Sequence, residues 1–212
     1  MRRVLLGLLG LVLGGYLAFA PAATVLDVPY RNQLDGSAYE FSNCGPAALS
    51  MVLAYYGVDA SPWELRVQSM RVQHTWVDDE GGYSNSYGVF AYNLATVARN
   101  YGVRTEGLWT YEGSRIDQLR QWSADDVRRQ ISWGRPVIVQ VKYRALPSHS
   151  GSHASADHFI VVRGMDGSGF VYSDPMGFDR SAELQRISES DLFGAMDRAA
   201  TQRTGFAVAL RG

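Results

Sequence analysis

Cysteine is almost absent from this sequence, because Cys44 is the only one among 212 residues. A lone cysteine has no partner in its own chain, so an internal disulfide cannot stabilise the fold. Only one of the 20 basic residues, Lys142, is a lysine, which we attribute to composition bias rather than to function. A formal net charge of −1 gives none of the basic surface typical of proteins that bind nucleic acids or acidic membranes.

Internal repeats and low-complexity linkers are absent too, which predicts one domain. With 46% hydrophobic and 19% charged residues, the chain can build a full core. Helical patterns come first and strand patterns later, which is the order of an α+β fold without strict alternation. We expect helices at 44–56, from 61, at 87–101, 123–133 and 190–200, and strands at 24–30, 103–109, 136–143, 158–163, 170–173 and 205–211.

One long uncharged stretch is present, at the N-terminus. It spans Val4 to Ala20, follows Arg2-Arg3 and ends in small residues. This pattern predicts a signal peptide over residues 1–22, cleaved before Ala23, and a domain over 23–212. The alternative is an uncleaved N-terminal anchor, which would be the only membrane contact. In both cases we expect an exported domain, which is secreted, periplasmic or held at the cell surface.

The single cysteine stands at the start of a strongly apolar helix. Gly45 and Pro46 are expected to open this helix, with proline at its first position, and Gly57 to close it. Backbone N–H groups at a helix N-terminus favour the thiolate, which is the nucleophilic form of cysteine. Since unpaired cysteines are unusual in exported proteins, Cys44 is a candidate nucleophile.

A cysteine nucleophile needs a base, and His158 is the best candidate among the histidines. It opens an apolar strand, where an unpaired imidazole is costly, although a satisfied structural histidine remains the alternative. His149 and His153 lie in a loop over 144–157 rich in Ser, His and Gly, and we expect surface residues there rather than a metal pair. His74 has no informative context.

The base in turn needs an orienting group and the reaction an oxyanion donor. A turn at 166–169 brings Asp174 back towards His158, although an ordinary turn aspartate is the alternative. Asp157 ranks below Asp174 because neighbours on a strand point to opposite faces. Gln33 lies in the polar loop before Cys44, where its amide is a candidate donor or simply a solvated side chain.

Together these segments resemble papain-like cysteine peptidases of the double-glycine, bacteriocin-processing type, and in particular the stand-alone peptidase C39-like domains of bacteria. The resemblance spans nearly the whole chain after residue 22. It rests on four segments: VPYRNQ (28–33), CGPAALSMVL (44–53), HFIVVRGMD (158–166) and VYSDP (171–175).

The resemblance implies an α+β papain-like fold, in which the nucleophile helix of an N-terminal helical part packs on a C-terminal antiparallel sheet. It also implies roles: Cys44 as nucleophile, His158 as base and later acid, Asp174 as orienting residue and Gln33 as oxyanion donor. The implied reaction is peptide-bond cleavage through a thioester, without a metal or organic cofactor.

The substrate stays open between peptides and cell-wall peptide cross-links. The double-glycine peptidases are fused to membrane-spanning and ATP-binding segments, whereas this sequence has no phosphate-binding loop, so leader processing coupled to transport is not expected. Two alternatives use the same fold: a non-catalytic peptide-binding module, and a thiol-dependent acyl or peptidyl transferase. Oligomeric state and the roles of the loops at 72–86 and 144–157 are not predicted, and the Trp76–Glu80 segment is expected to be solvated.

Overall fold

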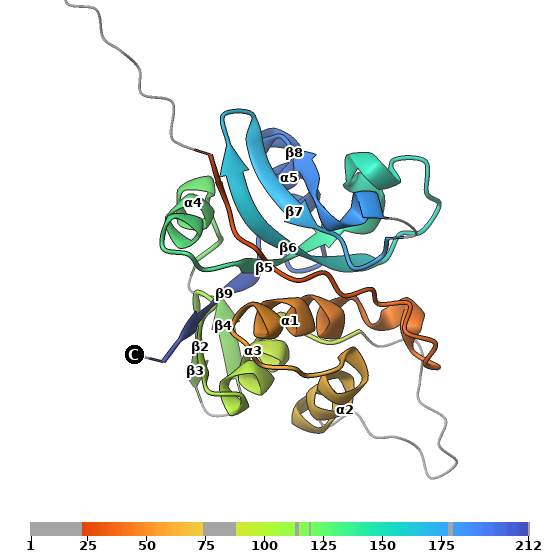
Figure 1. Cartoon of the computed structure of the whole chain (residues 1–212), viewed down its shortest axis with the longest axis vertical. Helices are drawn as coiled ribbons and strands as arrows, with labels where there is room; N and C mark the ends of the chain where they lie inside the picture. The colour runs from red at the N-terminus through yellow and green to blue at the C-terminus, as the bar shows by residue number, and fades with distance from the viewer. Residues whose placement is uncertain (1–22, 74–87, 113–114, 119, 178–179, 212) are drawn as a thin grey trace, which may run out of the picture.

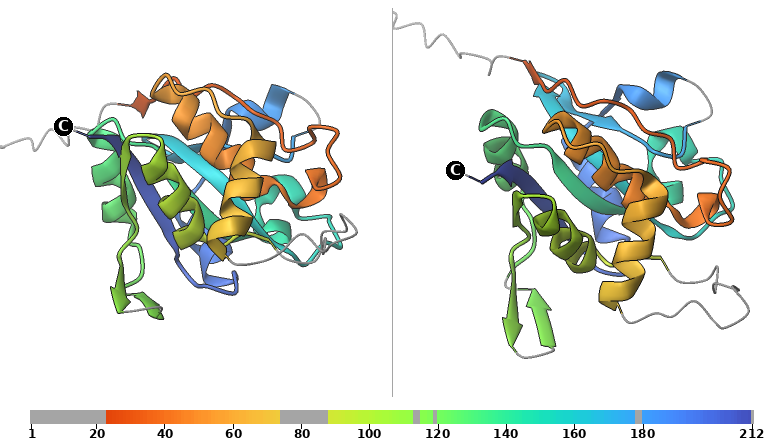
Figure 2. Two further views of the ribbon diagram at one scale, coloured as in Figure 1. Left: turned by 90° about the horizontal axis from the view of Figure 1, so that it is seen from below. Right: turned by 60° about the horizontal axis from the view of Figure 1, so that its bottom comes forward.

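An antiparallel sheet of seven strands runs through the centre of the molecule (Figure 1). The computed structural model describes residues 23–73, 88–112, 115–118, 120–177 and 180–211. The sheet has the order β2-β9-β5-β6-β7-β8, with β1 also paired to β6. Its strands are β1 (Thr24–Val25), β2 (Val103–Glu106), β5 (Val137–Lys142), β6 (Asp157–Asp166), β7 (Gly169–Ser173), β8 (Gln185–Ile187) and β9 (Gly205–Leu210). A separate hairpin of β3 (Trp109–Glu112) and β4 (Arg115–Gln118) projects from the body (Figure 2).

Helices cover both faces of the sheet. On one face lie α1 (Cys44–Tyr55), α2 (Pro62–Gln73) and α3 (Ala91–Asn100), and α1 packs directly on β6 (Figure 1). On the other lie α4 (Ala124–Ser132) and α5 (Glu189–Asp197), joined by an ion pair between Arg128 and Glu189. Short 3₁₀ turns are η1 (Glu40–Ser42), η2 (Tyr143–Ala145), η3 (Pro147–His149) and η4 (Arg180–Glu183). The predicted α+β arrangement is confirmed.

The core explains why α1 forms where it does. Every residue from Gly45 to Leu53 is buried, as expected of a helix that is apolar on all sides and enclosed by other elements.

Across the residues that the structure describes, no helix has the length and apolar character needed to cross a membrane.

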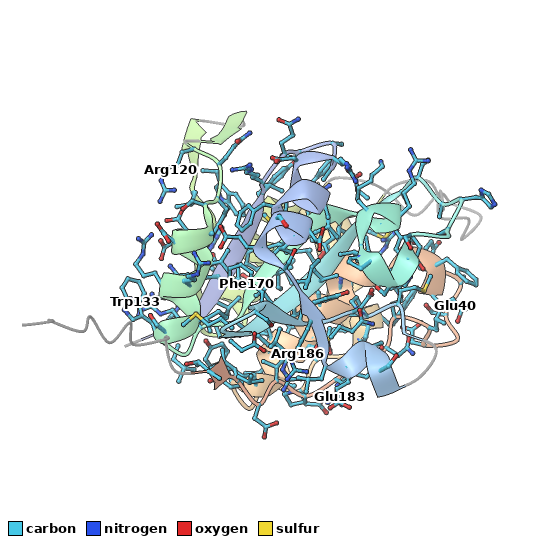
Figure 3. All side chains as sticks on the ribbon, turned by 90° about the horizontal axis from the view of Figure 1, so that it is seen from above. Glu40, Arg120, Trp133, Phe170, Glu183 and Arg186 are labelled. Atoms are coloured by element: carbon cyan, nitrogen blue, oxygen red, sulfur yellow. The ribbon has the colours of Figure 1, made fainter. Side chains whose placement is uncertain are left out.

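Helix ends follow the expected signals. Gly57, Gly102 and Gly134 lie just beyond α1, α3 and α4 with φ of +78°, +81° and +71°, which glycine adopts without strain. Ser123 caps α4 in a reciprocal capping box with Asp126. In Figure 3, Arg120 lies by the first turn of α4 and Trp133 at its other end.

Several predicted boundaries are wrong. Asn43 is the N-cap of α1, so Pro46 is the third helical residue rather than the first, still within the turn whose N–H groups have no helical partner. The helix expected at 87–101 begins at Ala91. The strand expected at 103–109 ends at Glu106, and Leu108, with φ of +57°, turns the chain into β3. The loop expected at 72–86 lies almost wholly outside the described residues.

The strand expected at 24–30 is only two residues long. β5 pairs with β6 from Asp157 to Val162, so β1 finds a free edge only further along, opposite Gly164 and Met165. A bulge between Val162 and Gly164 interrupts the pairing with β7 at this point. The competition for one strand edge therefore shortens β1.

Residues 24–33 form an extended strap from this edge to the end of β7. Leu26 exchanges three bonds with Arg163: its N–H donates to the Arg163 carbonyl at 2.8 Å, and the guanidinium donates to the Leu26 carbonyl at 2.9 and 2.7 Å. At the other end the Tyr30 hydroxyl donates to the Asp174 carbonyl at 3.0 Å, and the Gln33 N–H to that of Pro175 at 2.9 Å. The strap thus ties the N-terminal end of the domain to the residues after β7.

Candidate active site

Cys44 is the first residue of α1 and its thiol is partly buried. The residue after it allows α1 to approach the sheet closely. A Cβ on Gly45 would lie 2.7 Å from Val89, 2.8 Å from Leu94 and 3.1 Å from Phe159 of β6. Glycine at this position therefore sets the thiol against the start of β6.

His158 lies on β6 opposite Val141, with 5% of its side chain exposed. Its ring hydrogen-bonds the Cys44 thiol, and the sulfur also accepts from the backbone N–H groups of Phe159 and Gly45. Burial opposes ionisation of the thiol, but these contacts and the charge of His158 outweigh it and lower the pKa of Cys44. The structure thus favours a thiolate.

Asp174 follows the end of β7 and its side chain is fully buried. Its Oδ1 lies 2.7 Å from Nε2 of His158 and accepts from the Met176 N–H at 2.8 Å. Burial alone would raise the pKa of this carboxyl group, but the charge of His158 and the hydrogen bonds from His149 and His158 hold it well below the usual range. Asp174 is therefore an ionised acceptor beside the imidazole.

Cys44, His158 and Asp174 form one hydrogen-bonded chain. Because Nε2 of His158 faces Asp174, Nδ1 is the ring nitrogen left for the thiol. Burial disfavours the charged ring, but Asp174 and the Cys44 sulfur outweigh it and raise the pKa of His158 to about 10. The lowered thiol pKa and the raised imidazole pKa both favour the thiolate–imidazolium form of the pair.

Gln33 is 1% exposed, so it is not the solvated loop residue of the alternative interpretation. One of its amide hydrogens is donated to the Glu40 carbonyl at 2.7 Å, while its Oε1 is buried without a partner among the described residues. The second amide hydrogen of Gln33 is not used in the bond to Glu40. Glu40 is labelled in Figure 3, on the same side of the molecule as the start of α1.

Asp157 points away from the site, as the alternation of side chains along a strand predicts. Its carboxylate accepts from Lys142 and from Gln140, each at 3.0 Å, and from the Ala200 N–H at 2.8 Å. It makes these contacts on the face that α5 covers, so Asp174 and not Asp157 lies beside His158.

His149 was missed by the sequence analysis, which expected a surface residue. Its Nε2 lies 2.7 Å from Oδ2 of Asp174, and only 14% of its side chain is exposed. His153, in the same loop, is exposed as expected. Nothing in the local sequence pattern distinguishes the two. No group of three or more His, Cys, Asp or Glu side chains suited to a metal ion occurs among the described residues, this cluster included.

Comparisons with known proteins show the family and the fold of the chain. Residues 25–198 match the Peptidase_C39 like family. No curated protein matches the chain. A structure described as a C39-like peptidase from Bacillus anthracis is 16% identical, with a TM-score of 0.60 over 90% of this chain and 98% of that one.

Two further structures share the fold. A double-glycine motif protease from an AMS/PCAT transporter, in complex with the leader peptide, is 22% identical, with a TM-score of 0.51 over 87% of this chain and 91% of that one. The peptidase domain of Streptococcus ComA is 20% identical, with a TM-score of 0.50 over 81% and 93%. The resemblance drawn from the sequence and the papain-like α+β fold are confirmed.

Proposed function

Since the chain belongs to the Peptidase_C39 like family, a family of cysteine-peptidase fold, we propose that it hydrolyses peptide bonds with Cys44 as the nucleophile. The observation that carries the proposal is the chain of contacts from the Cys44 thiol through His158 to buried Asp174. A nucleophile, a base and an orienting carboxylate in that order are what acyl transfer by a thiol requires.

In the first step the Cys44 thiolate attacks the carbonyl carbon, and an S–C bond forms as the carbonyl π pair moves to oxygen. The backbone N–H of Cys44 and the second amide hydrogen of Gln33 are the proposed oxyanion donors. His158 then gives its Nδ1 proton to the leaving nitrogen, the C–N bond breaks, and a thioester remains.

In the second step a water molecule attacks the thioester, and His158 takes its proton. Collapse of this intermediate breaks the S–C bond, releases a carboxylic acid and restores the thiolate–imidazolium pair. Throughout, Asp174 holds the ring so that Nδ1 faces the sulfur and stabilises its positive charge.

Peptides are the proposed substrate class. The structural neighbour from an AMS/PCAT transporter is bound to a leader peptide, which supports a peptide substrate here. Residues 1–22 support export, so the substrates we propose are peptides or cell-wall peptide cross-links outside the cytoplasm.

Alkylation of Cys44 by iodoacetamide tests the proposal without a known substrate. We expect the wild type to react faster than free cysteine at and below neutral pH, because the lowered pKa of its thiol favours the thiolate. His158→Ala removes the imidazolium, so at pH 6 the rate should fall by about tenfold or more, the effect of one pKa unit. His153→Ala, in the exposed loop, is the matched control and should keep the wild-type rate.

Cleavage itself is measured by mass spectrometry on a synthetic peptide library, with Cys44→Ser as the inactive control. New termini with wild type alone support a peptidase, and adding an amine acceptor separates hydrolysis from transfer. A wild-type alkylation rate equal to that of free cysteine, together with no cleavage, would refute the proposal.

A further inference from the structure

The loop between β5 and β6 is fastened beside Asp174. Leu146 is fully buried, and its carbonyl accepts the His149 N–H at 2.9 Å. The Ser148 hydroxyl lies 3.3 Å from that of Tyr172 on β7. These contacts hold η3 and the backbone of His149 against β7, so the ring of His149 occupies a defined place.

His149 completes the hydrogen bonding of the Asp174 carboxylate. Oδ1 accepts from His158 and from the Met176 N–H, whereas Oδ2 lies 2.7 Å from Nε2 of His149. A carboxylate only accepts, so the proton of this contact sits on Nε2 of His149. Because Asp174 is fully buried, loss of this donor would leave a charged oxygen without its partner in a dry site.

An aromatic neighbour holds the plane of the His149 ring. The Tyr143 ring stacks on His149 with centroids 4.0 Å apart and an interplanar angle of 17°. The same ring meets His158 edge-on, at 5.2 Å and 84°. Tyr143 therefore orients both histidines on either side of Asp174.

We propose that His149 is a positioning residue for the proposed peptidase reaction, which fixes the rotation of the Asp174 carboxylate so that Oδ1 faces His158. The inference rests on the proposed function. The ring centroids of His149 and His158 lie 6.5 Å apart, and it is Asp174 that bridges the two rings. The hydrogen bonds from His158 and from the Met176 N–H both meet Oδ1, so the contact of His149 with Oδ2 adds a second anchor that opposes rotation of the carboxylate.

The other titratable groups around Asp174 stay uncharged near neutral pH. Burial and the negative charge of Asp174 raise the pKa of Tyr143. Burial raises the pKa of Tyr172 to about 12. The Ser148 contact opposes this shift, and the negative charge of Asp174 adds to it. The acid limb of Cys44 reactivity therefore reports on the thiol, His158 and Asp174.

Two substitutions separate the hydrogen bond from the stack. His149→Phe keeps an aromatic ring for Tyr143 and removes the donor, while His149→Gln keeps an N–H donor of similar reach and removes the ring. The readout is the pH profile of Cys44 alkylation by iodoacetamide, with His153→Phe in the exposed part of the loop as control.

We expect His149→Phe to move the acid limb upward, so that alkylation below the limb slows threefold to tenfold, about half to one pKa unit. Asp174 then holds His158 less well, and the thiolate is lost at a higher pH. His149→Gln should stay within about twofold of wild type, as rescue by the donor requires.

An unchanged or downward-shifted limb in His149→Phe would overturn the inference, since the freed carboxylate would then serve His158 as well or better. Equal losses in both variants would assign the effect to packing and overturn it too. If His149→Phe does not fold, His149→Asn replaces it, because its shorter amide falls short of Oδ2. The proposed function fails only if His158→Ala also leaves the profile unchanged, so the two failures are distinguishable.

Discussion

Replacing Asp174 by asparagine should weaken the stabilisation of the His158 imidazolium, and with it that of the Cys44 thiolate, while keeping a side chain of nearly the same size at this position. The carboxylate accepts hydrogen bonds from both histidines at 2.7 Å, whereas asparagine offers one oxygen and no charge. A hydrogen bond to a charged group contributes about 1.5–3 kcal/mol and one between neutral groups about 0.5–1.5 kcal/mol. The difference of about 1–1.5 kcal/mol corresponds to about one pKa unit of the His158–Cys44 pair.

The assay is the alkylation of Cys44 by iodoacetamide across pH. In Asp174→Asn the acid limb should move up by about one unit, so that below the limb the rate falls about tenfold while the plateau above it is unchanged. Asp157→Asn is the matched control, because Asp157 precedes His158 but bonds Lys142 on the other face of the sheet. A profile of Asp174→Asn that coincides with the wild type, or an equal shift in Asp157→Asn, would refute the reasoning.

Two further predictions concern stability and are measured by urea denaturation. Gly45→Ala should lower the free energy of unfolding by about 1–3 kcal/mol, because its Cβ would lie under 3.0 Å from two side chains. The control Gly194→Ala in α5, where no atom lies within 4 Å of the new Cβ, should raise it by about 0.5–1 kcal/mol. A Gly45→Ala protein as stable as wild type would contradict the tight fit. Asp126→Asn should cost about 1–3 kcal/mol at neutral pH and exposed Asp125→Asn under about 1 kcal/mol. Because the Arg120 hydrogen bond lowers the pKa of Asp126, its contribution is present above the pKa of an unfolded carboxyl and is lost as the pH falls towards the folded value, and a deficit that does not shrink in acid would argue against it.

The sequence predicts the elements whose signals are local. The turn at 166–169 joins two apolar strands, so the pairing of β6 and β7, and with it the approach of Asp174 to His158, follows from neighbouring residues. The start of α1 is predicted to within two residues, because a polar loop gives way to an apolar run at Cys44, although the helix begins at Cys44 rather than at Pro46. Alternation along β6 also separates Asp157 from Asp174 correctly.

What the sequence does not predict depends on contacts between distant segments. β1 is shorter than its pattern because β5 already occupies the edge of β6, and no property of residues 24–30 reveals that competitor. His149 reaches Asp174 because Leu146 is buried and Ser148 lies against Tyr172, which are tertiary facts. Gly45 reads as a helix-opening residue, but its role is to leave room for β6 and α3.

Asn43 is another residue whose role depends on tertiary contacts rather than on the local sequence. It directly precedes Cys44 and is completely buried, and its amide nitrogen donates to Asp35 at 3.3 Å and to Ser37 at 3.2 Å. Asparagine is a favoured N-cap, yet here the side chain makes no capping hydrogen bond to α1. It instead ties the preceding loop to the start of the helix, which residue preference alone does not indicate.

The strap sets the shortest recombinant fragment that keeps the site intact. A fragment that begins at Val28 would lack Leu26, and with it the carbonyl that accepts both guanidinium bonds of Arg163. Arg163 is buried, so water could not readily replace the lost Leu26 carbonyl. At the other end of the strap, the Tyr30 hydroxyl holds the backbone carbonyl of Asp174. Arg163 lies five residues along β6 from His158, or about 16 Å at about 3.3 Å per residue. We therefore expect truncation at Val28 to disturb Asp174 through the strap, and trimming should stop before Thr24.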